Sequence, residues 1–337
     1  MNERTNYLTS IRGFACLIVF IAHLISTIPE IGIYVSGCGK IGVWLFFILS
    51  ALLLTLQWNK EENINITNII KFYIKRIFRI YPCYIIVLIL AFFIGNIDNI
   101  TTILKHLFLL EGFGHLWTIP VEFVFYLILP FLIILIKKFK KTKYQIIFLF
   151  TILIISEILF PYFLYEENSI NIKWYIPVFI MGILLSYSFK YFEKKNLSSI
   201  FFDIICLVVL LFMLFSTPYF RQILFNIKPD SYLQNKYLYF GIGWCIILVS
   251  IQNSKYIIKY LNKSKTLIKL GNISFPLYLV HYIILNLLTI DNILLYFLSV
   301  FVISIFLSVI LNKFIEIPMI KISKNILQII EKTNYNN

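Results

Sequence analysis

Ten apolar segments follow one another along the chain, each separated from the next by a polar or charged connection. An α-helix needs about 20 apolar residues to cross the hydrocarbon core of a lipid bilayer. Backbone groups in lipid must find hydrogen-bond partners within their own element, which favours helices. The sequence therefore predicts an all-α polytopic membrane bundle of about ten transmembrane helices. The expected spans are residues 10–28, 41–58, 80–96, 117–136, 145–163, 173–190, 200–216, 236–252, 270–290 and 293–315.

The basic residues are concentrated in every second connection between these segments. The chain is 60% hydrophobic and 14% charged, yet its formal net charge is +14. Most of its lysines and arginines fall at the N-terminus (Arg4 and Arg12), in alternate connections such as 71–79 and 137–143, and after residue 313. The positive-inside rule then predicts that both termini are cytoplasmic. The basic excess thus indicates membrane topology, and we expect no nucleic-acid partner. The other connections hold only Lys40, Lys105, Lys173, Arg221, Lys228 and Lys236.

The cysteines are odd in number and lie mostly in apolar segments. Their spacing fits neither a disulfide framework nor a metal site, and we expect no metal. We interpret them as small apolar residues. They are Cys16, Cys38, Cys83, Cys206 and Cys245.

The first apolar segment carries two ionisable residues, Arg12 and His23. Such groups at membrane depth are costly and usually mark a site or a pathway. They are eleven positions apart, so both project from one helix face, roughly 16 Å apart along the axis. Arg12 is either an interfacial anchor or a ligand for an anion. His23 is either a packed residue or a general base, since imidazole titrates near neutral pH.

A second basic cluster precedes the third span. Arg76 and Arg79 lie three residues apart, on one face of a helix. They are either cytoplasmic anchors or a fork for phosphate oxygens. With Arg12 on the same side, these arginines are candidates to hold a polyphosphorylated cytoplasmic donor.

The fourth span combines an interfacial aromatic residue with a carboxylate. Trp117 fits the outer interface, and Glu122 follows just below the outer surface in an apolar run. A buried carboxylate needs a partner or a proton. His23 is a plausible partner for Glu122, which would orient it as a base; the alternative is a structural hydrogen bond to a neighbouring helix.

The last two spans carry a polar stripe and a terminal carboxylate. Ser274, Tyr278 and His281 step by four and three residues, so they share a helix face and are candidates to line a cavity. Glu316, in the Glu-Ile-Pro sequence that ends the tenth expected span, lies at the cytoplasmic level. We expect it to neutralise Arg12 or Arg79.

Six motifs in this order resemble the acyltransferase family 3 membrane proteins over nearly the whole chain. Arg12 to His23 is similar to the family's Arg-x10-His element, and residues 42–50 are similar to its second-helix motif. Ala51 stands where the family usually has glycine. The remaining matches are Arg76 to Arg79, Trp117 to Glu122, Ser274 to His281, and Glu316 to Pro318.

This resemblance implies a bacterial inner-membrane enzyme that moves acyl groups, most often acetyl, from cytoplasmic coenzyme A. The acceptors in the family are hydroxyls of cell-envelope glycans or lipid-linked saccharides at the outer face. Many relatives carry a fused soluble domain, so we expect either direct action on the acceptor or a separate periplasmic or extracellular partner. The expected domain covers residues 1–325, followed by a short cytoplasmic tail, 326–337.

The expected site joins the residues with the resemblance. Arg12, Arg76 and Arg79 bind the phosphates of acetyl-CoA. His23 removes the proton of the acceptor hydroxyl or first takes the acyl group itself, and Glu122 orients His23 or the acceptor. The alternative is a secondary transporter or exporter of a glycan or lipid-linked intermediate, since ten helices and buried charges also suit transport.

Overall fold

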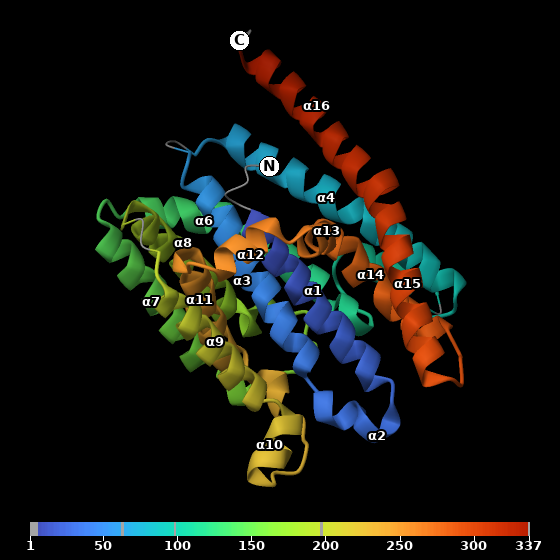
Figure 1. Ribbon diagram of the computed structural model, residues 1–337. Coiled ribbons are helices and arrows are strands. Elements are labelled where there is room, and N and C mark those ends of the chain that lie inside the picture. Colours follow the sequence, from blue (N-terminus) through green and yellow to red (C-terminus); the bar gives the residue numbers. More distant parts are fainter. Residues whose placement is uncertain (1–5, 62–63, 98, 196–197, 336–337) are drawn as a thin grey trace. The chain divides into compact units, whose positions relative to one another are not determined.

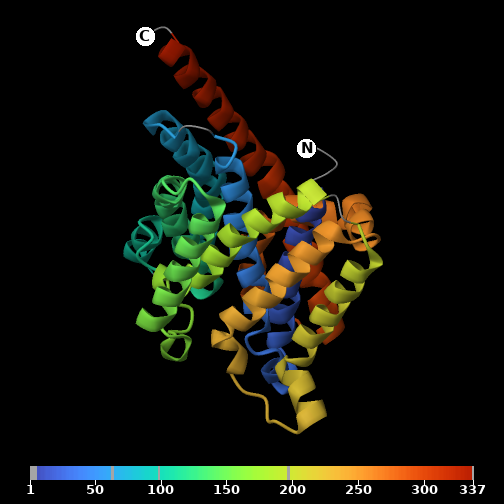
Figure 2. The ribbon, with the colours of Figure 1, turned by 90° about the vertical axis from the view of Figure 1, so that its left-hand side faces the viewer.

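The computed structural model describes residues 6–61, 64–97, 99–195 and 198–335, and within these ranges it contains no β-strand. The predicted all-α architecture is therefore confirmed (Figures 1 and 2). Arg4 and residues 336–337 lie outside the described residues. The α-helices are α1 (Asn6–Ser26), α2 (Pro29–Gly32), α3 (Cys38–Trp58), α4 (Ile66–Phe93), α5 (Ile100–Leu107), α6 (Thr118–Lys137), α7 (Thr142–Leu159), α8 (Ile176–Lys195), α9 (Ile200–Phe215), α10 (Pro218–Phe225), α11 (Tyr237–Asn253), α12 (Ile257–Lys263), α13 (Lys265–Asn272), α14 (Ser274–Leu287), α15 (Ile293–Leu311) and α16 (Ile317–Tyr335). The short connecting helices are η2 (Ile33–Val35), η3 (Gly114–Trp117), η4 (Tyr162–Leu164), η5 (Ile172–Trp174), η6 (Tyr232–Asn235) and η7 (Asn312–Glu316).

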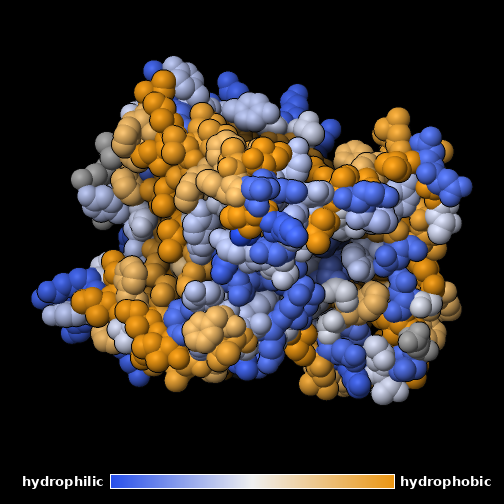
Figure 3. All heavy atoms as spheres, turned by 90° about the horizontal axis from the view of Figure 1, so that it is seen from below, coloured by the Kyte–Doolittle hydropathy of each residue, from blue (hydrophilic) through white to orange (hydrophobic). Residues whose placement is uncertain are grey.

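Every expected span coincides with a helix or a helix pair, but the helices differ in length. Among the described residues, six helices are long and apolar enough to cross a membrane, or eight if each of two bent pairs counts as one span. The other two expected spans are shorter apolar helices, Ile176–Phe192 and Tyr237–Asn253. Many large apolar side chains are exposed, and Figure 3 shows hydrophobic residues reaching the surface over much of one face.

The expected span 270–290 is broken in the structure, and the expected span 200–216, which α9 fills, is followed directly by a second, bent helix. The helices α9 and α10 meet at 81°, and α13 and α14 meet at 74°, close to Ile273. The first pair breaks before Pro218, since a proline disfavours helical backbone in the residue before it. The expected single span 270–290 is therefore two helix segments.

The last expected span does not end where the sequence predicted. A proline in a helix interior removes a backbone hydrogen bond and usually breaks or kinks the helix. Here α15 passes into the π-helical turn η7, which runs directly into α16, with Pro318 at its second residue. The extra residue in a π turn shifts the backbone hydrogen-bond pattern, so the helix continues although the proline has no N–H to donate. The helix continues to Tyr335, through the position at which the tail was expected to begin; the 1–325 domain stays a prediction.

The chain divides into two compact units. Unit 1 comprises residues 1–60 and 135–274, and unit 2 comprises residues 61–134 and 275–337.

In unit 1, α3 packs against α1, α8 and α11. Small residues allow these close approaches. A Cβ on Gly42 would meet the Ala15 carbonyl oxygen at 2.6 Å, and one on Gly182 of α8 would lie 2.6 Å from the Cβ of Ala51. The alanine at position 51 is thus accommodated by a glycine on the facing helix.

The basic connections of unit 1 gather at one end of its bundle, which we call the basic end. Lys137 donates to the carbonyl of Trp58 at the end of α3 (3.1 Å), and Gln252 donates to the carbonyl of Phe189 (3.0 Å). Ser10, near the start of α1, donates to the carbonyl of Leu261 in α12 (2.6 Å). The ends of α3, α8 and α11 and the start of α1 thus share the side predicted to be cytoplasmic.

Unit 2 is built around α4, which packs against η7 and α16. The helix begins at Ile66, well before the expected span start at residue 80, because Asn65 caps it by accepting from the N–H of Asn68 (2.8 Å). Lys71 in its second turn forms an ion pair with Glu331 of α16 (2.7 Å). The arginine pair therefore lies on a helix, as expected, and this helix is continuous with the expected span 80–96.

Candidate functional site

Helix α1 carries Arg12 and His23 towards opposite ends of unit 1. Arg12 is half-buried at the basic end. Next to it, Gly13 lets α13 approach, since a Cβ there would collide with the Leu267 carbonyl oxygen and lie 2.9 Å from the Gly271 nitrogen. The helix therefore holds a guanidinium at the basic end and an imidazole roughly 16 Å further along.

His23 lies against the first turn of α3. A Cβ on Gly39 would be only 3.2 Å from His23 Nε2 and 3.5 Å from Cδ2. Glycine at position 39 thus leaves the imidazole its space. The side chain of His23 is half-buried, in contrast to the other described histidines, His106, His115 and His281, which are buried. The imidazole of His23 is therefore less enclosed than those of the other three histidines.

A polar network adjoins this turn of α3. Lys40, which is 8% exposed, donates to the hydroxyl of Tyr165 (3.3 Å). The Tyr165 hydroxyl lies 2.9 Å from that of Tyr175, which donates to the carbonyl of Ser169 (3.1 Å). Burial raises the pKa of the Tyr165 phenol to about 12, so it stays protonated at neutral pH. The end of unit 1 that holds His23 therefore also holds a buried ammonium group.

In unit 2, Arg76 and Glu122 share one cluster with Tyr126. Tyr126 donates a hydrogen bond to Glu122. The guanidinium of Arg76 lies 5.8 Å from the Tyr126 ring centre and 5.7 Å from that of Phe72. The charges of Glu122 and Arg79 both act on Arg76. We expected Arg76 at the cytoplasmic mouth and Glu122 near the outer surface. The structure brings them together, because α4 starts a long way before the expected span.

The polar stripe of α14 faces η3 and the start of α6. Tyr278 donates to the carbonyl of His115, and Thr118 donates to the Tyr278 hydroxyl (2.9 Å). The rings of His115 and His281 are 5.0 Å apart. Trp117 is also buried, with 4% of its surface exposed. These residues form a closely packed polar cluster.

Ser274 and Glu316 make local contacts. Ser274 donates to the carbonyl of Gly271 (2.8 Å), across the bend before α14. Glu316 is buried and accepts from Asn312, one turn earlier (2.7 Å). The described residues contain no ion pair between Glu316 and Arg79, and the alternative pairing of Glu316 with Arg12 stays a prediction. In the described part of the chain, no group of three or more histidine, cysteine or acidic residues is arranged to hold a metal ion.

Comparison with known proteins places this arrangement in a family. Residues 5–313 match the acyltransferase domain of acyltransferase family 3. The chain belongs to this family. All nine predicted site residues lie within the matched range.

The chain is also similar to curated proteins of Staphylococcus aureus. It is 24% identical over 315 residues to O-acetyltransferase OatA (strain NCTC 8325 / PS 47), over 82% of this chain and 49% of that protein. It is 23% identical over 323 residues to "Putative O-acetyltransferase SACOL0978" (strain COL), over 83% of this chain and 50% of that protein. The chain thus spans about half the length of these relatives. No solved structure matches it.

Sequence reasoning missed three residues that lie beside the predicted site residues. Gly39 has no side chain, and only its close approach to His23 shows that this position leaves space for the imidazole. Lys40 counted as one of the few basic residues outside the cytoplasmic set. Tyr126 lies four residues after Glu122, a spacing that places the two on one helix face and is the signal from which their contact follows.

Proposed function

We propose that the chain is a multi-pass O-acetyltransferase of a bacterial inner membrane. It transfers an acetyl group from cytoplasmic acetyl-CoA to a hydroxyl of a cell-envelope carbohydrate, free or lipid-linked, at the outer face. Family membership supports acyl transfer, and the names of the relatives support O-acetylation. The ten helical segments support a bundle that crosses the membrane ten times with both termini inside, if the two short helices also span.

The observation that carries the proposal is the placement of Arg12 and His23 on α1. Arg12 lies at the basic end of unit 1, and His23 lies at the other end against Gly39. Basic residues favour the cytoplasmic side of a membrane. The donor therefore binds at the Arg12 end, and the acceptor reaches the His23 end from outside.

The arginines suit the phosphate groups of coenzyme A. Guanidinium groups bind phosphate through paired hydrogen bonds. Arg76 has the features of such a ligand, since its Nε is buried and has no hydrogen-bond partner among the described residues. Arg12, Arg76 and Arg79 hold the donor phosphates, and the thioester arm extends along α1 towards His23.

The reaction needs a base at the acceptor hydroxyl. The hydroxyl oxygen attacks the thioester carbonyl carbon, so that a C–O bond forms and the C–S bond breaks. His23 takes the hydroxyl proton and passes it to the departing thiolate of coenzyme A. Glu122 acts as an orienting group in the same reaction, and Trp117, Ser274, Tyr278 and His281 line the acceptor path.

The test uses inside-out membrane vesicles and acetyl-CoA labelled in the acetyl group. The cytoplasmic face of these vesicles is accessible, so label added outside should reach the surface carbohydrate. His23→Ala and Arg12→Ala should each abolish this transfer at normal protein levels. Transfer by either variant at the wild-type rate would remove that residue from the mechanism.

Gene deletion tests the class of protein. Mass spectrometry of surface glycans should show loss of acetyl groups from otherwise complete glycans. Loss of the entire glycan would instead support export.

A further inference from the structure

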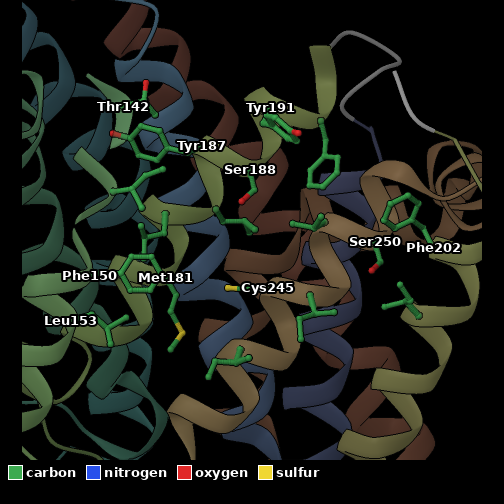
Figure 4. Close-up of a pocket in the computed structure, with 18 of the residues that line it drawn as sticks. Thr142, Phe150, Leu153, Met181, Tyr187, Ser188, Tyr191, Phe202, Cys245 and Ser250 are labelled. Carbon is green, nitrogen blue, oxygen red and sulfur yellow. The ribbon is translucent and has the colours of Figure 1, made fainter. Parts of the chain in front are cut away.

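A long apolar groove lies on unit 1, and none of the nine predicted site residues is among those that line it. It is formed by α7, α8, α9 and α11 and encloses a cavity of about 970 Å³ (Figure 4). This volume is at the upper end for small-molecule pockets. A groove of this size can bind one molecule, whereas a flat helix face contacts only lipids that exchange with the bulk membrane.

The lining changes in character along the groove. Phe150, Leu153 and Met181 form the apolar part, and the thiol of Cys245 points into its centre (Figure 4). The hydroxyl residues lie towards the start of α7 and the ends of α8 and α11, which belong to the basic end of unit 1. They are Thr142, Tyr187, Ser188, Tyr191 and Ser250. The groove is therefore amphipathic along its length.

The length of the groove corresponds to one lipid leaflet. Thr142 and Leu153 are eleven positions apart on α7, which is a rise of roughly 16 Å at 1.5 Å per residue. The hydrocarbon core of a bilayer is about 30 Å thick, so each leaflet contributes about 15 Å. A lipid chain that starts at the hydroxyl end thus reaches the apolar end near the bilayer midplane.

Positive charge flanks the hydroxyl end. Lys141 and Lys143 adjoin Thr142, Lys190 adjoins Tyr191, and all three are exposed. The buried carboxylate of Asp203, next to the lining residue Phe202, accepts from the backbone N–H groups of residues 255–257. Its charge is thus used to cap α12. Lysine clusters at this membrane level attract anionic lipid head groups.

We propose that this groove binds one anionic phospholipid of the cytoplasmic leaflet. Its chain lies against Phe150, Met181 and Cys245, and its phosphate lies by Lys141 and Lys143. The leaflet follows from the orientation proposed above, but the binding does not depend on acyl transfer. A lipid-linked acceptor fits less well, because its head group would lie at the end opposite to His23.

Photo-crosslinking of the full chain in detergent tests this site. The probes are phosphatidylglycerol and phosphatidylcholine, each with the same diazirine-bearing acyl chain. Label from phosphatidylglycerol should map by mass spectrometry to α7, α8 and α11. The double variant Lys141→Ala/Lys143→Ala should lower the preference for phosphatidylglycerol over phosphatidylcholine by roughly tenfold.

A groove-filling substitution provides the second arm. Cys245→Trp should block labelling of the groove, while Leu207→Trp on the exposed face of α9 should leave it unchanged. If Cys245→Trp fails to fold, the lysine variant and the wild-type map still decide. Uniform labelling of all exposed apolar helices would overturn the proposal. Equal labelling of the groove by both lipids would do the same. Acetyl transfer is not the readout, so failure here is distinct from failure of the proposed function.

Discussion

The two units hold their histidines in opposite ways. In unit 1, His23 is half-buried at the end of α1 and lies against a glycine. In unit 2, His115 and His281 are 4% and 1% exposed, their rings pack together, and each has a ring nitrogen within hydrogen-bond distance of a backbone carbonyl. The imidazole of His23 is thus partly exposed, whereas those of His115 and His281 are enclosed by their neighbours. The two units differ in how far they bury the same type of side chain.

The largest expected effect comes from removing the half-buried imidazole. His23→Ala should lower acetyl transfer by roughly 10²–10⁴-fold, the usual contribution of a general acid or base. Its thermal stability in detergent should change less than that of a variant at a fully buried histidine, because His23 is half-buried. Turnover in membrane vesicles at matched protein levels measures the first effect. If His23→Ala unfolds, or if it transfers acetyl groups at the wild-type rate, the contrast drawn between the histidines of the two units is wrong.

The glycine beside His23 should give the next largest effect. In Gly39→Ala the new Cβ would lie 3.2 Å from His23 Nε2, so the ring must shift by a few tenths of an ångström. We expect kcat to fall by about tenfold, since small misplacements of a reacting group are costly. Gly42→Ala is the matched control, because its Cβ meets the Ala15 backbone and not His23. The control should lose stability without a specific loss of kcat, and equal behaviour of both variants would argue against positioning by Gly39.

The sequence predicted the helix positions well because apolar runs in a membrane protein are long and uninterrupted. The sequence-based predictions were wrong about the depth of individual side chains in the bundle and about where helices begin and end. The start of α4 at Ile66, set by the Asn65 cap, brings Arg76 into contact with the Tyr126 ring of the Glu122 cluster. Pro318 indicated a helix end, but the π turn η7 carries the helix through it. Such features depend on contacts or backbone adjustments that no periodic pattern reveals.

Substitution of a buried histidine of unit 2 should lower the stability of the protein and leave the rate of transfer unchanged. His115→Leu removes the contact between Nε2 and the Leu279 carbonyl (3.2 Å) and the polar packing with Tyr278. We expect a loss of about 1–3 kcal/mol in unfolding free energy, the cost of breaking a buried polar arrangement. Transfer per folded molecule should stay near the wild-type value. A loss of turnover without loss of stability would move His115 into the reaction.

The smallest effect is expected at Tyr165, beside the His23 end of unit 1. Tyr165→Phe removes the hydroxyl between Lys40 and Tyr175, at a cost of about 1 kcal/mol for a lost hydrogen bond. Because burial raises the pKa of Tyr165 to about 12, its phenol stays neutral in the folded protein at physiological pH. The raised pKa stabilises the fold only while the phenol is protonated, so this contribution is lost as pH rises from about 10 to about 12. The pH profile of transfer near neutrality should therefore be the same in wild type and variant. A shifted profile would mean that the Lys40 network tunes the titration of His23, and the contrast between the units would then rest on charge as well as on space.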